Sequence, residues 1–236
     1  MILSGNVEYI IEGNTYKLAP YDILITNENE LHNVRILSDA TYERVVLNIK
    51  ADFFKLYDIE PYQKIFTDRK PGNDNLIKGF IVQSEGIYDS LMRIEHYITE
   101  GNKKNDMIIR AMIIELLHIL NKASLGEEKQ DKKSAVVADI ISYINKNLSE
   151  PLSLDETAKQ FFISKYHLCR IFKESTGFTF NKYITVKRIA MVKALCQEGH
   201  NISEAVAMSG FGNYSNFYRI YVSLTGNSPK NDLKDI

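Results

Sequence analysis

The sequence has few cysteines and no long apolar run, and these absences exclude several classes of protein. Only two cysteines, Cys169 and Cys196, occur among the 236 residues, so we expect no disulfide scaffold and a cytoplasmic protein. No apolar run approaches the roughly 18 residues that a membrane-spanning helix needs. The first residues also lack the basic region and apolar core of a signal peptide. We therefore expect neither secretion nor a membrane partner.

Patterns that carry catalysis or bind metals are missing as well. The sequence has no Ser/His/Asp or Cys/His layout, no Gly-rich phosphate loop and no cluster of metal ligands. Its histidines are scattered singly: His32, His96, His118, His167 and His200. We expect no cofactor, no metal and no enzymatic activity.

A repeat is the most informative feature of the sequence. The pattern from Leu154 to Gly177 recurs from Ile202 to Gly226. Equivalent positions are 48 residues apart in the first half of the pattern (Leu154 to Ile202) and 49 apart in the second (Gly177 to Gly226), so a turn absorbs one extra residue. Each half has apolar residues at helical spacing behind a capping residue. The repeat predicts two helix-turn-helix units.

The second helix of each unit exposes residues that can bind base edges and phosphates. A solvated polar face is the alternative for one such helix, but recurrence of the layout with an arginine in register favours DNA binding. The predicted DNA-binding residues are Ser164, Lys165, Tyr166, Cys169, Arg170 and Lys173 in the first unit, and Asn213, Tyr214, Ser215, Asn216, Tyr218 and Arg219 in the second.

The balance of charge differs along the chain. Residues 135–236 contain 9 Lys and 3 Arg against 9 Asp and Glu, a net charge of +3, and the whole chain carries −1, so residues 1–134 carry −4. A charge of +3 is small for a DNA-binding domain. We expect affinity to depend on individually placed residues more than on a general basic field.

These residues also carry a family resemblance. Residues from about 136 to 236 resemble the DNA-binding domain of AraC-type transcription regulators, and the matching features include Pro151–Leu154, Ala158, Arg170–Lys173, Gly177, Arg188, Gly210-Phe211, Arg219, Gly226 and Ser228-Pro229. Departures fall mainly in the second unit: Val206 replaces alanine, Tyr221 replaces phenylalanine, Val222 replaces lysine, and Asp232-Leu233 replaces an aromatic-arginine pair. The resemblance implies a regulator of transcription, in most cases an activator, with double-stranded DNA and RNA polymerase as partners.

The N-terminal part is expected to be a β domain. Strands are predicted at Val7–Ile11, Tyr16–Leu18, Ile23–Ile25 and Tyr42–Ile49, with a turn at Gly13-Asn14, and such spacing is typical of a sandwich or barrel. The segments from Tyr16 to His32 and from Tyr42 to Leu47 resemble the cupin-like sensor domain of the same regulators. The metal ligands of a cupin would precede Gly5, so we expect no metal and an incomplete barrel. His32 and Arg44 are the candidate ligand contacts.

Two helices are expected after the strands. Ile87, Leu91, Ile94 and Ile98 form one apolar stripe, and the segment from Met107 to Leu125 is apolar around most of its circumference. Its second face either packs against the barrel or forms a homodimer interface, with these candidates: Ile109, Met112, Ile113, Leu116 and Leu120.

The predicted architecture is therefore multidomain. An all-β cupin-like sensor domain (residues 1–85) and a helical dimerisation or packing segment (86–125) precede a charged linker (126–134). An all-α domain (135–236) follows, in which a long helix from Thr179 to Gln197 joins the two helix-turn-helix units.

The predicted function is sequence-specific transcription regulation, with an N-terminal domain that senses a small-molecule effector or mediates dimerisation. In one alternative the N-terminal domain binds a protein partner and no small molecule. A more distant alternative is a cupin enzyme or sugar-binding module with an accessory helical domain.

Overall fold

The computed structural model describes residues 1–123 and 135–233, and the chain forms two compact units. Unit 1 comprises Met1–Tyr9, Thr15–Asn27 and Val34–Gln130, and unit 2 comprises Ile10–Asn14, Glu28–Asn33 and Asp131–Ile236. Two short N-terminal segments thus belong to the same unit as the C-terminal helices, outside the range expected from the sequence. The predicted linker, residues 126–134, lies outside the described residues.

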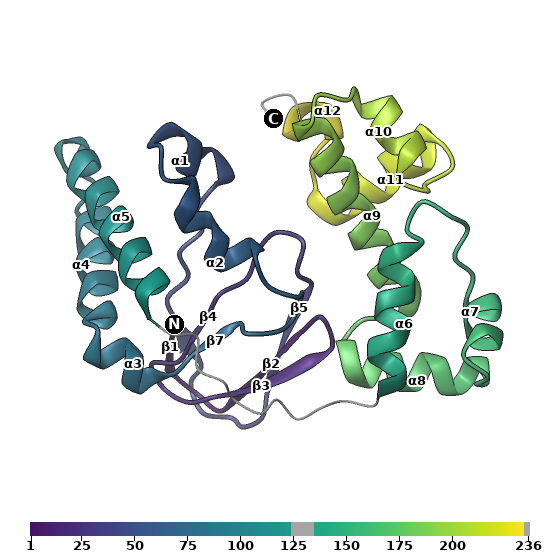
Figure 1. Ribbon diagram of the computed structural model, residues 1–236, viewed down its shortest axis with the longest axis horizontal. Coiled ribbons are helices and arrows are strands. Elements are labelled where there is room, and N and C mark those ends of the chain that lie inside the picture. Colours follow the sequence, from purple (N-terminus) through teal and green to yellow (C-terminus); the bar gives the residue numbers. More distant parts are fainter. Residues whose placement is uncertain (124–134, 234–236) are drawn as a thin grey trace. The chain divides into compact units, whose positions relative to one another are not determined.

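Short strands dominate the first part of the chain (Figure 1). They are β1 (Ile2–Ser4), β2 (Val7–Ile11), β3 (Asn14–Leu18), β4 (Ile23–Leu24), β5 (His32–Ile36), β6 (Glu43–Arg44) and β7 (Leu76–Ile77). Within the described residues they form a three-stranded sheet of order β3-β2-β5 and two antiparallel pairs, β1-β6 and β4-β7. The strand-rich N-terminal region is confirmed.

The strand predicted from Tyr42 to Ile49 is much shorter than expected. Only Glu43 and Arg44 pair with a neighbouring strand, although half-buried and exposed residues alternate from Arg44 to Ile49. The partner strand, β1, has three residues, and one further backbone bond joins the Val45 amide to the Met1 carbonyl at 2.9 Å. Alternation alone could not show how long the partner strand is.

The hairpin between β2 and β3 turns one residue earlier than predicted. Glu12 and Gly13 have φ angles of 47° and 87°, and Asn14 already begins β3. Two consecutive positive φ angles are the requirement of a type I′ turn, which matches the twist of the flanking strands. Glycine adopts this conformation readily, whereas a glutamate there needs compensating contacts.

The other regular elements among the described residues of unit 1 are helices. They are α1 (Ala51–Leu56), the 3₁₀ helix η1 (Glu60–Gln63), α2 (Lys64–Thr67), α3 (Gly79–Ser84), α4 (Ile87–Glu100), η2 (Lys103–Asn105) and α5 (Asp106–Lys122). The two long helices, α4 and α5, lie side by side (Figure 1). Their facing residues, including Ile94 and Leu116, form one core with Ile23 and Ile77 from the strands.

The residues proposed for a dimer interface on α5 contribute to this core instead. Met112, Leu116 and Leu120 are buried, and Ile109 and Ile113 pack against the same cluster. The apolar circumference of α5 is needed because α4 and the strands cover more than one of its faces. Packing within the unit, the alternative, thus buries three of the five and half-buries the other two.

Unit 2 contains the C-terminal helices α6 (Ala135–Lys146), α7 (Leu154–Gln160), α8 (Lys165–Thr176), α9 (Phe180–Gln197), α10 (Ile202–Met208), α11 (Tyr214–Thr225) and α12 (Pro229–Asp232). They surround two separate cores. One gathers Ile140, Leu168, Phe172 and Tyr183 around α6 to α8 and the start of α9, and the other gathers Val192, Val206, Phe217 and Tyr221 around the end of α9, α10 and α11.

Candidate DNA-binding surface

The sequence repeat corresponds to two structural copies of one helix pair. We call α7 with α8 the first copy and α10 with α11 the second. The leading helices have seven residues each and the second helices twelve each. Gly177 and Gly226 end the second helices with the same φ of 77°. A left-handed C-terminal residue is the usual position of glycine, because no Cβ then strains the backbone.

Each helix of both copies begins at the capping residue that the sequence indicated. The Ser153 and Asn201 side chains accept hydrogen bonds from the amides of Glu156 and Glu204, 3.1 and 3.0 Å away. Only the second copy completes a capping box. The second helices are capped by Ser164, which accepts from the His167 amide, and by Asn213, which accepts from the Asn216 amide.

The one-residue slip lies in the turn between the helices. Four residues separate α7 from α8 and five separate α10 from α11. In the first turn Phe162 has a positive φ of 55°, and its equivalent in the second, Gly210, has a φ of 82°. A Cβ on Gly210 would lie 2.5 Å from the Leu148 carbonyl oxygen, so this turn is enclosed, whereas the Phe162 side chain is 96% exposed.

All six residues predicted to bind DNA on the first copy are exposed. Tyr166 is 80% exposed. Arg170 lies 3.4 Å from the ring of His167, and Lys165 forms an ion pair of 2.5 Å with Asp155 of α7. Both partners of that pair are exposed, so the pair is weak and does not prevent Lys165 from contacting a phosphate.

The second copy exposes a different surface on the same frame. Five of its six predicted residues are exposed and Asn216 is half-buried. Arg219 donates a hydrogen bond of 3.3 Å to Asn216, which repeats the Arg170–His167 contact at the equivalent positions. The rings of Tyr214 and Tyr218 lie 6.2 Å apart, so the aromatic residues of this helix contact each other.

The long helix α9 joins the copies, and its N-cap is Thr179 as the sequence suggested. The Arg188 guanidinium donates to the carbonyls of Leu148 and Glu150, at 2.9 and 2.7 Å, and burial lowers the pKa of Arg188. Arg188 is thus a structural residue that fixes α9 to the chain entering α7.

Within unit 2, a buried ionic cluster links the β2–β3 turn to α9. The Glu12 carboxylate lies 2.7 Å from the Lys187 ammonium and accepts hydrogen bonds from the Tyr183 hydroxyl at 2.5 Å and the Leu31 amide at 2.6 Å. Lys187 also donates to the Asn29 carbonyl at 2.6 Å. Burial and the Glu12 charge raise the pKa of Tyr183. The sequence pattern did not predict this cluster, because Glu12 and Tyr183 are 171 residues apart along the chain.

The two candidate ligand contacts of the N-terminal region belong to different units. His32 in unit 2 is exposed, and its Nδ1 lies 3.0 Å from the Glu30 carbonyl oxygen. Arg44 in unit 1 donates to the Tyr9 hydroxyl, which lies 2.6 Å from the Tyr42 hydroxyl. The hydrogen bond to Tyr9 is the main reason that the pKa of Arg44 is raised, and burial raises the pKa of Tyr42 to about 12.

Residues 1–123 and 135–233 contain no group of three or more potential metal-ligating side chains. None of the helices in those ranges is long and apolar enough to cross a bilayer.

Paired helices with matching caps, turns and exposed polar faces define a helix-turn-helix protein. Residues 157–235 match the model of a helix-turn-helix domain. The match lies within the residues whose pattern resembles the DNA-binding domain of AraC-type regulators.

Several proteins similar to this chain are named as regulators. An uncharacterized HTH-type transcriptional regulator of Staphylococcus aureus (strain COL) is 22% identical over 97% of this chain and 30% of its own length. The uncharacterized HTH-type transcriptional regulator YfiF of Bacillus subtilis is 29% identical over 50% of this chain and 39% of its own length. The chain thus spans about a third of the curated relatives it matches. The solved structure of ToxT from Vibrio cholerae is 16% identical, with a TM-score of 0.42, and covers 99% of this chain and 87% of its own.

Proposed function

We propose that this chain is a sequence-specific regulator of transcription whose two helix-turn-helix copies occupy successive major-groove segments of one duplex. The observation that supports this is the pair of twelve-residue helices, α8 and α11, with equivalent caps and an exposed arginine at the same position. The eighteen residues of α9 span about 27 Å. Successive major-groove segments on one side of a duplex are about 34 Å apart.

In this proposal Arg170 and Arg219 contact base edges, and the lysines and hydroxyls around them contact phosphates. The net charge of +3 on residues 135–236 provides little general attraction. Specific contacts must then supply most of the affinity, and the binding should still weaken steeply with salt because phosphates are neutralised.

A selection of genomic fragments by the purified full chain at physiological salt tests the proposal. Enrichment of one motif with two half-elements about one helical turn apart would support both copies as readers. A single half-element would assign reading to one copy alone. Failure to enrich any motif, with and without cell extract as a source of effector, would refute sequence-specific binding.

The N-terminal region, in this proposal, is a cupin-like module that receives a signal. The Arg44 guanidinium has tyrosine hydroxyls as its partners among the described residues, and a carboxylate ligand would provide the opposite charge that it lacks. A panel of small carboxylic acids added to the wild-type chain and to Arg44→Ala tests this. An acid that raises the unfolding temperature of the wild type alone would support the site, and a panel with no such acid would oppose it.

Assembly is the second candidate role of this region, and a specific feature favours it. Ile98 at the end of α4 and Met107 and Ile108 at the start of α5 are 54%, 72% and 43% exposed. Exposed apolar residues close together are typical of interaction sites. A homodimer through this end should appear in light scattering as twice the chain mass and should become monomeric in Met107→Lys.

We propose further that the chain is an activator. Its DNA-bound form should then increase transcription by purified RNA polymerase.

A further inference from the structure

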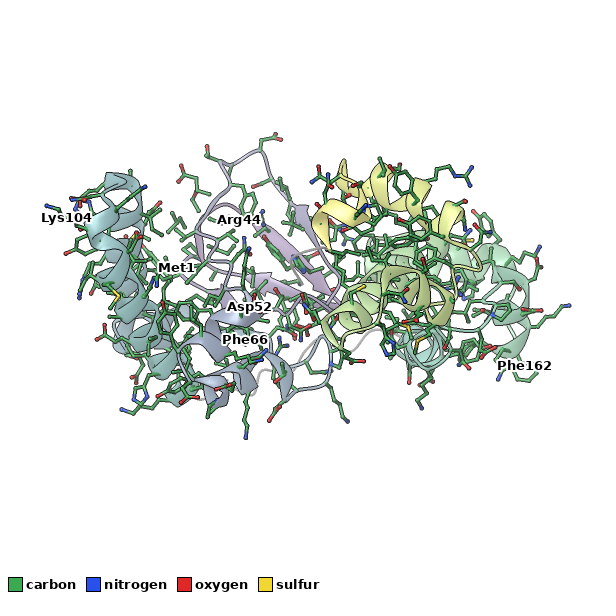
Figure 2. All side chains as sticks on the ribbon, turned by 90° about the horizontal axis from the view of Figure 1, so that it is seen from above. Met1, Arg44, Asp52, Phe66, Lys104 and Phe162 are labelled. Atoms are coloured by element: carbon green, nitrogen blue, oxygen red, sulfur yellow. The ribbon has the colours of Figure 1, made fainter. Side chains whose placement is uncertain are left out.

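The turn of the first copy holds an apolar side chain that no other described residue covers. Phe162 and Tyr166 are 96% and 80% exposed, the two highest values among the large apolar side chains of the described residues. Figure 2 shows Phe162 at the outer margin of the helical unit. The neighbouring Phe161 behaves as expected for a core residue, since its ring packs against Tyr143 with centroids 5.7 Å apart.

The backbone at this position favours a different residue. Phe162 adopts a φ of 55°, in the left-handed region that strains every residue with a Cβ and suits glycine best. The second copy has a glycine at the equivalent position, Gly210. Phe162 therefore combines backbone strain with an unburied ring, and neither stabilises the fold. Strain of this kind in a well-formed turn is typical of a functional site.

The surroundings of Phe162 indicate its partner. The turn leads directly into Ser164, Lys165 and Tyr166, which begin the helix proposed to read DNA. Lys159 on the preceding turn is also exposed, so cationic side chains flank the ring on both sides along the chain. The ring of Phe162 therefore lies beside the cationic side chains that are proposed to bind the major groove. In that position it can contact the apolar groups that lie between the phosphates of DNA.

We infer that Phe162 is a DNA-contacting residue of the first copy, and that its ring packs on an apolar group at the edge of the major groove. Thymine methyl groups and deoxyribose are the two apolar groups that DNA offers there, and phenylalanine is known to contact the methyl group. The inference rests on the proposed DNA binding. It adds an apolar DNA contact that the second copy lacks, because Gly210 has no side chain.

Phe162→Gly should change the stability of the chain and its affinity for DNA in opposite directions. Glycine relieves the left-handed strain, so the full-length variant should unfold at a higher denaturant concentration than the wild type. Loss of the ring should nevertheless weaken binding to the selected duplex by about tenfold. Phe162→Leu should retain most of the affinity. Phe80→Ala, which removes an exposed ring from unit 1, is the matched control and should bind like the wild type.

Replacing the thymines of the duplex by uracil, one at a time, distinguishes the two apolar groups. A uracil that weakens the wild type but not Phe162→Gly identifies a methyl contact, and equal behaviour at every position identifies the deoxyribose. The inference is overturned if Phe162→Gly binds the duplex as tightly as the wild type. In that event, weak binding by Arg170→Ala would still support the proposed function. The inference is also overturned if Phe162→Gly binds the duplex normally but fails to increase transcription by purified RNA polymerase, since the ring of Phe162 would then contact the polymerase.

Discussion

Leu31, from the N-terminal region, packs against the core of the first helix-turn-helix copy. Glu12, from the same region, forms an ion pair with Lys187 of α9, the helix that follows this copy. The core of the second copy, as far as the described residues show, draws only on residues from Ile189 to Leu233. Their surfaces differ too. Lys165 and Lys173 of the first copy correspond to Tyr214 and Val222 of the second. The two copies thus share one arrangement of helices. The first is more cationic and packs against residues of the N-terminal region, whereas the second is less cationic and its core draws on nearby residues alone.

The largest expected effect comes from removing the support of the first copy. Glu12→Gln leaves the Lys187 ammonium buried without its counter-charge, and the free energy of unfolding should fall by about 3–5 kcal/mol. Glu8→Gln, which breaks the partly exposed pair with Arg35, should cost less than about 1 kcal/mol. Denaturant unfolding measures both. Amide exchange should become faster in α8 and not in α11, and equal changes in the two helices would contradict the asymmetry.

The two arginines test whether the copies contribute equally to DNA binding. Arg170→Ala should weaken binding to the selected duplex by about 1–3 kcal/mol and relax sequence preference. Arg219→Ala should cost less, because fewer cations surround it. Fluorescence anisotropy titrations at two or more salt concentrations measure both losses. If Arg170→Ala changed neither affinity nor preference, the placement of the first recognition helix would be wrong.

The two C-terminal glycines sharpen the comparison further. Alanine at either Gly177 or Gly226 meets the same left-handed strain, which costs about 1 kcal/mol. A Cβ on Gly177 would also lie 2.5 Å from the Asn33 amide nitrogen, whereas Gly226 has open space around it. Gly177→Ala should therefore destabilise the chain more than Gly226→Ala in the same denaturant experiment. Equal losses would mean that Asn33 moves aside freely.

Tyr221 provides the smallest expected effect. Its hydroxyl donates to Asp232 at 3.1 Å, while its counterpart Phe172 has no hydroxyl, so Tyr221→Phe should cost about 1 kcal/mol. Burial and Asp232 raise the pKa of Tyr221 to about 12. The unfolded chain releases this proton near pH 10, so the contribution of Tyr221 to stability should decline from about pH 10 to about pH 12. In unfolding experiments at alkaline pH, Tyr221→Phe should lack this part of the decline in stability.

The repeat shows how much could be predicted from the sequence. The caps, the helix ends and the extra turn residue depend on local rules, and they recur where the spacing placed them. Alignment of the copies also pairs Phe162 with Gly210, a signal that could have identified the exposed ring from the sequence. The Glu12–Lys187 pair and the short β6 depend on partners far along the chain, which periodicity does not describe. The twelve predicted DNA-binding residues remain predictions until binding is measured.

The ionic cluster at Glu12 has a consequence for exchanging parts between regulators. A chimera that joins residues 135–236 to a foreign N-terminal domain would leave Lys187 without its carboxylate and the first core without Leu31. The exchangeable module is instead discontinuous and includes Ile10–Asn14 and Glu28–Asn33. A transplant of the helical domain should therefore carry that hairpin tip and loop with it, or replace Lys187 by an apolar residue.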